Sequence, residues 1–88
     1  MDNFDNIIRM EKILNMALEA VRLKDTAALR NMSNEINELI AYYESEAWLK
    51  DFEADEKGLF PANLKRGVLS EDAVYDLICD LEELNFSK

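Results

Sequence analysis

The chain has 88 residues, of which 49% are apolar and 33% charged, and it carries a formal net charge of −9. A surface this acidic repels phosphate backbones and anionic lipid headgroups, so we expect neither nucleic acid nor a membrane as a direct partner. The length predicts a single helical domain over residues 1–88 with a thin core. Only two glycines and one proline are present, which favours long helices and an all-α fold.

Two features of the sequence predict the cellular compartment. The opening stretch MDNFDNIIRMEKIL carries acids where an export signal needs basic residues, and no apolar run reaches the roughly 18 residues of a membrane span. The single cysteine, Cys79, cannot form an internal disulfide, which suits a reducing environment. We therefore expect a cytoplasmic protein.

A first amphipathic helix is predicted from Asn3 to Lys24. Its apolar residues recur at steps of three and four along one face, namely Ile7, Met10, Leu14, Ala17 and Val21. A second apolar stripe runs down another side and consists of Ile13, Met16, Ala20 and Leu23. A helix that is apolar over more than half of its circumference must contact two neighbours, or one neighbour and another chain. The second stripe is therefore our candidate self-association surface, and a homodimer is the hypothesis that follows.

A second helix should begin after the sequence KDT, with Asp25 or Thr26 as its N-cap. The same spacing of apolar residues continues through Leu29, Met32, Ile36, Leu39 and Tyr43. Two consecutive helices with matching stripes and so short a connection predict a long antiparallel hairpin.

A short third helix is expected after a turn near Glu44 and Ser45, because the aromatic residues that follow leave the phase of the preceding stripe. Ser45 is its predicted N-cap. Its inward face should consist of Trp48, Leu49 and Phe52. Gly58 is a suitable residue to end this helix.

The stretch GLFPANLKRG is the least regular part of the chain. We expect Leu59 and Phe60 to fill the core. Pro61 should open a single turn that ends at Gly67.

A C-terminal amphipathic helix is predicted after Ser70, its N-cap, with Glu71 in the first turn, where the helix dipole favours acids. Its apolar face consists of Val74, Leu77, Ile78, Leu81 and Leu84. On the opposite side lies an acidic stripe of Asp72, Asp76, Asp80 and Glu83. This stripe is either a solubilising face or a surface that binds a basic partner or mimics DNA phosphates. It is our candidate partner-binding surface.

Lys65 and Arg66 lead through Gly67 toward the start of this helix, the arrangement of a phosphate site. Glu71 and Asp72 already place negative charge at that helix terminus, which disfavours an incoming phosphate. We therefore interpret the basic pair as support for the turn before Gly67, with salt bridges to neighbouring acids.

The residue types limit the chemistry that the chain can perform. No histidine is present, which removes the most common general base and transition-metal ligand. Two pairs of carboxylates, Glu35 with Glu38 and Glu53 with Glu56, resemble the magnesium motif of helical nucleotide pyrophosphohydrolases. However, Glu35 and Glu38 lie away from the apolar stripe of their helix. We assign no catalytic residue, no metal site and no cofactor.

The stretch from Tyr42 to Ile78, YYESEAWLKDFEADEKGLFPANLKRGVLSEDAVYDLI, is similar to a family of small bacterial proteins catalogued as a domain of unknown function. The resemblance rests on the Tyr-Tyr pair, the tryptophan and the string GVLSED. It implies a bacterial or phage origin and a helical domain. It implies no activity, so no functional residue is carried over.

The sequence as a whole predicts a small all-α bundle made of the long hairpin, the short helix and the C-terminal helix. The leading hypothesis for its function is a non-enzymatic cytoplasmic interaction or regulatory module that contacts a protein partner or a second copy of itself. The alternatives are an acidic inhibitor that mimics nucleic acid or binds a basic partner, and a magnesium-dependent all-α nucleotide hydrolase.

Overall fold

The computed structural model describes residues 4–84, and every regular element within them is a helix. The elements are α1 (Phe4–Arg22), α2 (Thr26–Asn31), α3 (Ser33–Tyr43), α4 (Glu46–Glu56), the 3₁₀ turn η1 (Gly67–Leu69) and α5 (Ala73–Glu83). The predicted all-α fold, a small helical bundle, is confirmed. Asn3, the predicted start of the first helix, lies outside the described residues.

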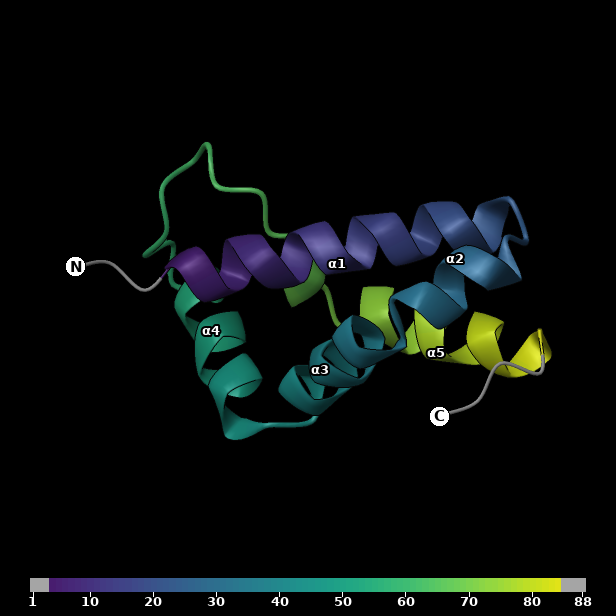
Figure 1. The fold of residues 1–88 in the computed structure, drawn as a ribbon. Helices are drawn as coiled ribbons and strands as arrows, with labels where there is room; N and C mark the ends of the chain where they lie inside the picture. Colours follow the sequence, from purple (N-terminus) through teal and green to yellow (C-terminus); the bar gives the residue numbers. More distant parts are fainter. Residues whose placement is uncertain (1–3, 85–88) are drawn as a thin grey trace.

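The longest helix, α1, runs along the length of a molecule that measures 37 × 19 × 19 Å (Figure 1). The chain turns back at the C-terminal end of α1, and α2 and α3 then follow it in the opposite direction. α5 and η1 also pack against α1. The core-facing side of α1 is the predicted one, since Ile7, Met10, Leu14 and Ala17 are all buried.

The second predicted helix is divided into α2 and α3 at Met32, whose backbone adopts φ −109° and ψ 25°. The amide of Met32 donates to the carbonyls of both Ala28 and Leu29, which tightens the end of α2. The bend leaves both segments in contact with α1. The apolar stripe is therefore continuous across the break, with Leu29, Met32, Ile36 and Leu39 buried.

Two helices end in the same hydrogen-bonded motif. At the end of α4, Gly58 has φ +72°, its amide donates to the Asp55 carbonyl, and the Leu59 amide donates to the Ala54 carbonyl. At the end of α1, Lys24 occupies the equivalent position with φ +54°, and the Asp25 amide donates to the Ala20 carbonyl at 2.8 Å. This is the Schellman arrangement, which normally places glycine at the residue with positive φ. Gly58 confirms its predicted role, whereas Lys24 holds a strained conformation.

Replacement of Lys24 by glycine is expected to stabilise the protein by about 1 kcal/mol. The left-handed conformation costs a residue with a Cβ about 1–2 kcal/mol, which exceeds the roughly 0.5–1 kcal/mol entropic penalty of glycine. In a domain of this size the melting temperature should rise by about 4–8 °C. Lys24→Ala is the control, since it removes the same charge but keeps the Cβ. Equal melting temperatures for the two variants would contradict the explanation.

Local capping signals are confirmed for α2 and α4. The Asp25 carboxylate accepts a hydrogen bond from the Ala28 amide at 3.1 Å, and Ser45 Oγ accepts one from the Trp48 amide. Each side chain satisfies an amide that the first helical turn leaves without a partner.

The predicted inward face of α4 is only partly correct. Trp48 and Phe52 are half-buried and stack on each other, but Leu49 is exposed. The reason is that, among the helices of residues 4–84, only α3 and η1 pack against α4, so a narrow strip of its surface is covered. Leu59, predicted to fill the core, is also exposed, whereas Phe60 packs edge-on against Phe4.

The C-terminal helix begins later than predicted. α5 starts at Ala73 with Asp72 as N-cap, and Ser70 instead accepts a hydrogen bond from the Asp72 amide through its Oγ. Gly67 opens η1 instead of ending a turn, because residues 67–69 form their own 3₁₀ turn that places Val68 and Leu69 in the core. The apolar face of α5 is the predicted one, with Val74, Leu77 and Leu81 buried and Ile78 and Leu84 half-buried.

Candidate functional site

Three side chains from three helices hold η1 and the residues directly after it in place. Glu11 Oε1 in α1 accepts a hydrogen bond from the Val68 amide at 2.7 Å. Trp48 Nε1 in α4 donates to the Val68 carbonyl at 2.9 Å, and the Tyr43 hydroxyl in α3 donates to the Glu71 carbonyl at 3.0 Å. We call the contacts of Glu11 and Trp48 with the Val68 backbone the Val68 brace. It joins the N-terminal helix to segments that follow far along the chain.

The Val68 brace explains the glycine in the string GVLSED. A Cβ on Gly67 would lie 3.1 and 3.2 Å from the two carboxylate oxygens of Glu11. The absence of a side chain lets the Glu11 carboxylate approach the backbone closely enough to accept the Val68 amide. Glu11 is itself contacted by Asn15 Nδ2 at 3.2 Å.

The tyrosine pair also makes structural contacts. The Tyr42 hydroxyl donates to Asp51 Oδ2 at 2.5 Å, which links α3 to α4. Burial and the hydrogen bond to Asp51 raise the pKa of Tyr42. Tyr43 packs edge-on against Trp48 at 5.2 Å between ring centroids. The Tyr-Tyr pair, the tryptophan and the GVLSE residues are therefore joined in one set of tertiary contacts.

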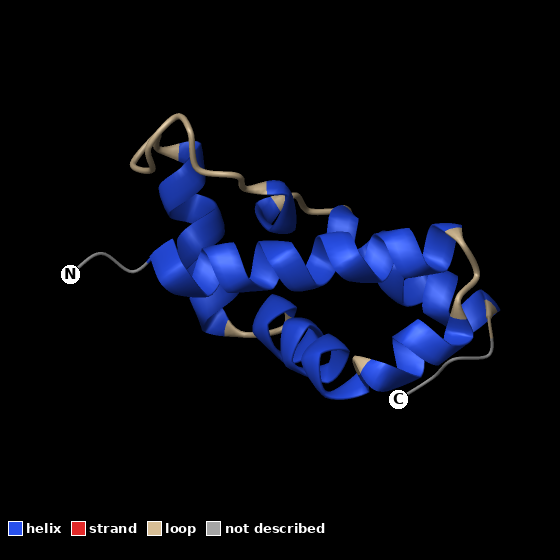
Figure 2. Ribbon diagram, turned by 45° about the horizontal axis from the view of Figure 1, so that its top comes forward, coloured by secondary structure: helices blue, strands red, loops and turns tan. Residues whose placement is uncertain are grey.

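Arg66 of the basic pair serves the loop, as its charge context predicts. Arg66 Nε lies 3.0 Å from Asp55 Oδ1, and Arg66 Nη1 donates to the Pro61 carbonyl at 3.0 Å. These contacts tie the loop after α4, drawn in tan in Figure 2, back to the end of that helix. Lys65 is exposed.

The acidic stripe lies on the outer side of α5. Asp72, Asp76 and Glu83 are exposed and Asp80 is half-buried. Three buried residues, Val74, Leu77 and Leu81, occupy the opposite side of the helix. The placement suits both a solubilising face and a partner-binding surface, so the role of the stripe stays a prediction.

The two Glu-x-x-Glu pairs are not gathered into one cluster. Glu38 forms an ion pair with Arg9, which links α3 to α1 and raises the pKa of Arg9. Glu53 and Glu56 are exposed on α4. Within residues 4–84, no group of three or more histidine, cysteine or acidic side chains is arranged to hold a metal ion.

The candidate self-association stripe is divided by the fold. Ile13 and Ala20 are 5% and 6% exposed, because α2 folds back against that side of α1. These two residues belong to the core of the chain, which corrects their assignment to a surface. Met16 and Leu23 are 52% and 58% exposed. Ile8, which neither predicted stripe includes, is exposed to the same degree as Met16.

Five exposed residues of α1 and the turn directly after it share one outer side of the helix. Ile8, Met16 and Leu23 are separated by eight and seven residues, which places them within one side of a helix. Lys12 and Glu19 lie between them and are also exposed. We call these five residues the α1 ridge. The spacing of Ile8 was a signal available in the sequence.

A groove runs along each side of the α1 ridge. The first lies between α1 and the loop after α4, has a volume of about 590 Å³ and is lined by residues that include Phe4, Ile8, Lys12, Met16, Pro61 and Leu64. The second lies between α1 and the α2–α3 segment, has a volume of about 600 Å³ and is lined by residues that include Arg9, Lys12, Met16 and Met32. Lys12 and Met16 border both grooves.

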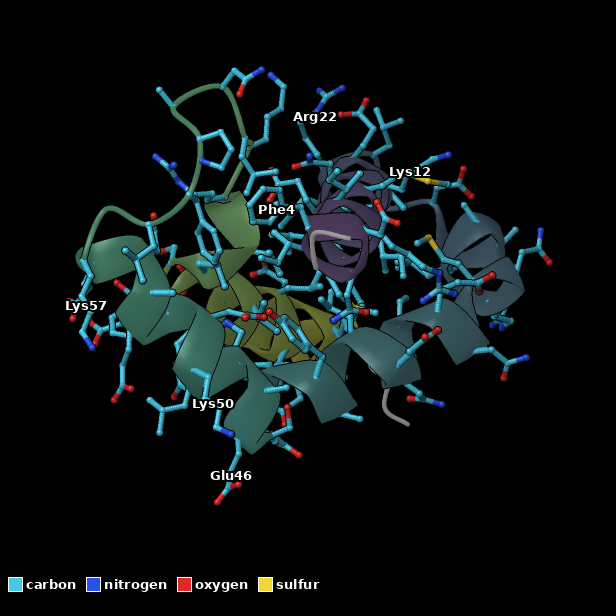
Figure 3. The ribbon with its side chains drawn as sticks, turned by 90° about the vertical axis from the view of Figure 1, so that its left-hand side faces the viewer. Phe4, Lys12, Arg22, Glu46, Lys50 and Lys57 are labelled. Atoms are coloured by element: carbon cyan, nitrogen blue, oxygen red, sulfur yellow. The ribbon has the colours of Figure 1, made fainter. Side chains whose placement is uncertain are left out.

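The charges on the α1 ridge differ in their surroundings. Arg22 donates to both carboxylate oxygens of Glu19, at 3.1 and 2.6 Å, and these hydrogen bonds lower the pKa of Glu19. Lys12 takes part in none of the ion pairs found within residues 4–84. Figure 3 shows Lys12 and Arg22 on the opposite side of the molecule from Glu46 and Lys50. The ridge therefore carries one fixed negative and one unpaired positive charge.

Comparison with known proteins identifies the family. In the part of the chain that the structure describes, no helix has both the length and the apolar character needed to cross a bilayer. Neither the curated proteins nor the solved structures contain a match. The predicted resemblance to a domain of unknown function is confirmed, and the match extends well beyond the stretch from Tyr42 to Ile78. The chain belongs to the family described as Domain of unknown function (DUF4298), whose model matches residues 7–87.

Proposed function

We propose that this chain is a non-enzymatic, cytoplasmic interaction module that binds another protein surface through the α1 ridge. The observation that carries the proposal is the row of three large apolar side chains, each more than half exposed, of which two lie on the outer side of the longest helix and Leu23 directly follows its end. Large apolar side chains gathered on one exposed side of a small domain are typical of a protein-binding site. The single cysteine supports a reducing compartment.

The shape of the surface also supports this proposal. Met16 borders a groove on each side of the ridge. Side chains of a partner can therefore enter both grooves and pack around Met16. A binding surface with apolar groups at its centre and charges beside them is the usual arrangement of protein interfaces.

The other two functions have weaker support. The acidic stripe of α5 offers solvated carboxylates, which a solubilising face explains equally well. The Glu-x-x-Glu pairs that suggested a hydrolase are divided between α3 and α4, and one member, Glu38, is engaged by Arg9. We therefore place the interaction site on α1.

The proposal is tested by Met16→Asp, with Tyr75→Asp as a matched control on the outer side of α5, where Tyr75 is also more than half exposed. Each protein is immobilised and exposed to a native lysate of the source organism, and retained proteins are identified. In a separate measurement, light scattering gives the mass of each purified protein in solution. We expect wild type and Tyr75→Asp to retain a stoichiometric partner or to self-associate. The affinity of Met16→Asp for that partner or for itself should be about tenfold or more lower.

Two results would contradict the proposal. One is a wild-type protein that neither self-associates nor retains a partner. The other is retention by Met16→Asp equal to that of the wild type.

A further inference from the structure

The α1 ridge is complementary to itself in an antiparallel arrangement. If two copies of α1 are paired about a point between Asn15 and Met16, Ile8 lies opposite Leu23 of the second copy. In the same register Lys12 lies opposite Glu19 of the second copy, and each of these pairs occurs twice. Four of the five ridge residues thereby meet a side chain of matching polarity or opposite charge, and Met16 lies beside the axis opposite Asn15.

We infer that the α1 ridge is covered by a second copy of this chain in a twofold-symmetric dimer, with α1 antiparallel to α1. The inference rests on the proposed function and names its partner. A twofold axis brings the same surface of both copies together, so the surface must be self-complementary. The α1 ridge meets this requirement through two apolar pairs and two ion pairs.

Charge determines the direction of the pairing. A parallel pairing in register would place Lys12 opposite Lys12 and Glu19 opposite Glu19, and like charges that face each other are repulsive. The antiparallel register converts both repulsions into attractions. The Glu19 carboxylate is held in place by Arg22, which keeps it charged, and Lys12 is in none of the ion pairs within residues 4–84.

The net charge of −9 makes a second copy an unfavourable partner over most of the surface, because two such copies repel each other. The α1 ridge is an exception, since opposite charges alternate along it with apolar residues. The distance from Ile8 to Leu23 along the helix is about 22 Å, shorter than the span of a standard interface. We therefore expect dimerisation of micromolar strength, and stronger association in solutions of higher salt where the overall repulsion is screened.

The test is a charge-reversal experiment with Lys12→Glu and Glu19→Lys, followed by sedimentation equilibrium. Each variant alone should dimerise about tenfold or more weakly than wild type, because each places two pairs of like charges in the interface. An equimolar mixture should recover the wild-type affinity, because the first variant presents acids at both positions and the second presents bases. The mixed dimer then contains two Glu–Lys pairs.

The controls are Lys50→Glu and Glu46→Lys, which change the net charge by the same amounts on α4. Figure 3 shows both residues on the side of the molecule away from Lys12. These variants should dimerise as wild type does, apart from the small effect of net charge. Far-UV circular dichroism of each variant establishes that it is folded.

Two outcomes would overturn the inference. In one, the mixture associates no more strongly than its components. In the other, the wild type remains monomeric at millimolar concentration. If a monomeric wild type still retains a protein that Met16→Asp loses, the proposed function stands and the second copy is the wrong partner. If Met16→Asp has no effect on any association, the proposed function fails as well.

Discussion

An Ile13→Asp variant is expected to be largely unfolded at room temperature. Ile13 is 5% exposed and belongs to the core cluster, so the substitution removes a buried side chain and places a carboxylate among apolar neighbours. The lost burial costs about 1.5–3 kcal/mol, and a buried polar group without a partner costs roughly 2–7 kcal/mol more. A domain of this length has a total stability of about 4–13 kcal/mol. The expected penalty therefore consumes most of the stability.

Met16→Asp is the matched comparison, because it places the same residue three positions further along α1 on an exposed site. It should change the free energy of unfolding of the monomer by about 0.5 kcal/mol or less. Urea denaturation followed by far-UV circular dichroism measures both variants. A folded Ile13→Asp protein with near wild-type stability would show that Ile13 lies at a surface, as the apolar stripe in the sequence suggested.

The second large effect is expected for Glu11→Ala, which removes the α1 half of the Val68 brace. Val68 is fully buried, and its amide donates to the Glu11 carboxylate at 2.7 Å. Loss of a hydrogen bond to a charged group typically costs about 1.5–3 kcal/mol when the buried partner is left unsatisfied. We expect a loss of about 2–3 kcal/mol in the free energy of unfolding, measured by urea denaturation.

Two further variants separate the hydrogen bond from other effects of Glu11→Ala. Glu11→Gln keeps an oxygen acceptor without the charge, so it should lose about half as much stability. Trp48→Phe removes the other half of the Val68 brace, and the double variant with Glu11→Ala should show a coupling energy of about 0.5–3 kcal/mol. Wild-type stability for Glu11→Ala would mean that its hydrogen bond to Val68 contributes nothing, and strictly additive losses in the double variant would mean that the two contacts act independently of each other.

The features of this fold that could be predicted depend on neighbours within one or two helical turns. Asp25 and Ser45 cap helices because their side-chain oxygens reach amides three residues away. Gly58 ends α4 because it tolerates a positive φ. The burial of Ile7, Met10, Leu14 and Ala17 in α1, and the apolar face of α5, follow from the helical period alone. Each of these is a local property of the chain.

The errors concern residues whose environment depends on distant segments. The helical period predicts that Leu49 faces inward. Of the helices in the described part of the chain, however, only α3 and η1 contact α4, and neither covers Leu49. The break at Met32 leaves the apolar spacing intact, so the pattern of residues contains no sign of it. The Val68 brace joins residues 57 positions apart, and no sequence spacing relates Glu11 to Val68.

The candidate site on α1 also combines features that local sequence determines with features that depend on distant segments. The sequence by itself determined that α1 carries more apolar surface than one neighbour can cover, because its two stripes span more than half of the helix. Only the tertiary structure decided which part stays exposed. α2 folds back over Ile13 and Ala20, whereas Ile8, Met16 and Leu23 face outward. The helical period gives the arrangement of residues around the helix axis. Which of these residues reach solvent depends on where the neighbouring helices lie, and packing across the whole chain sets those positions.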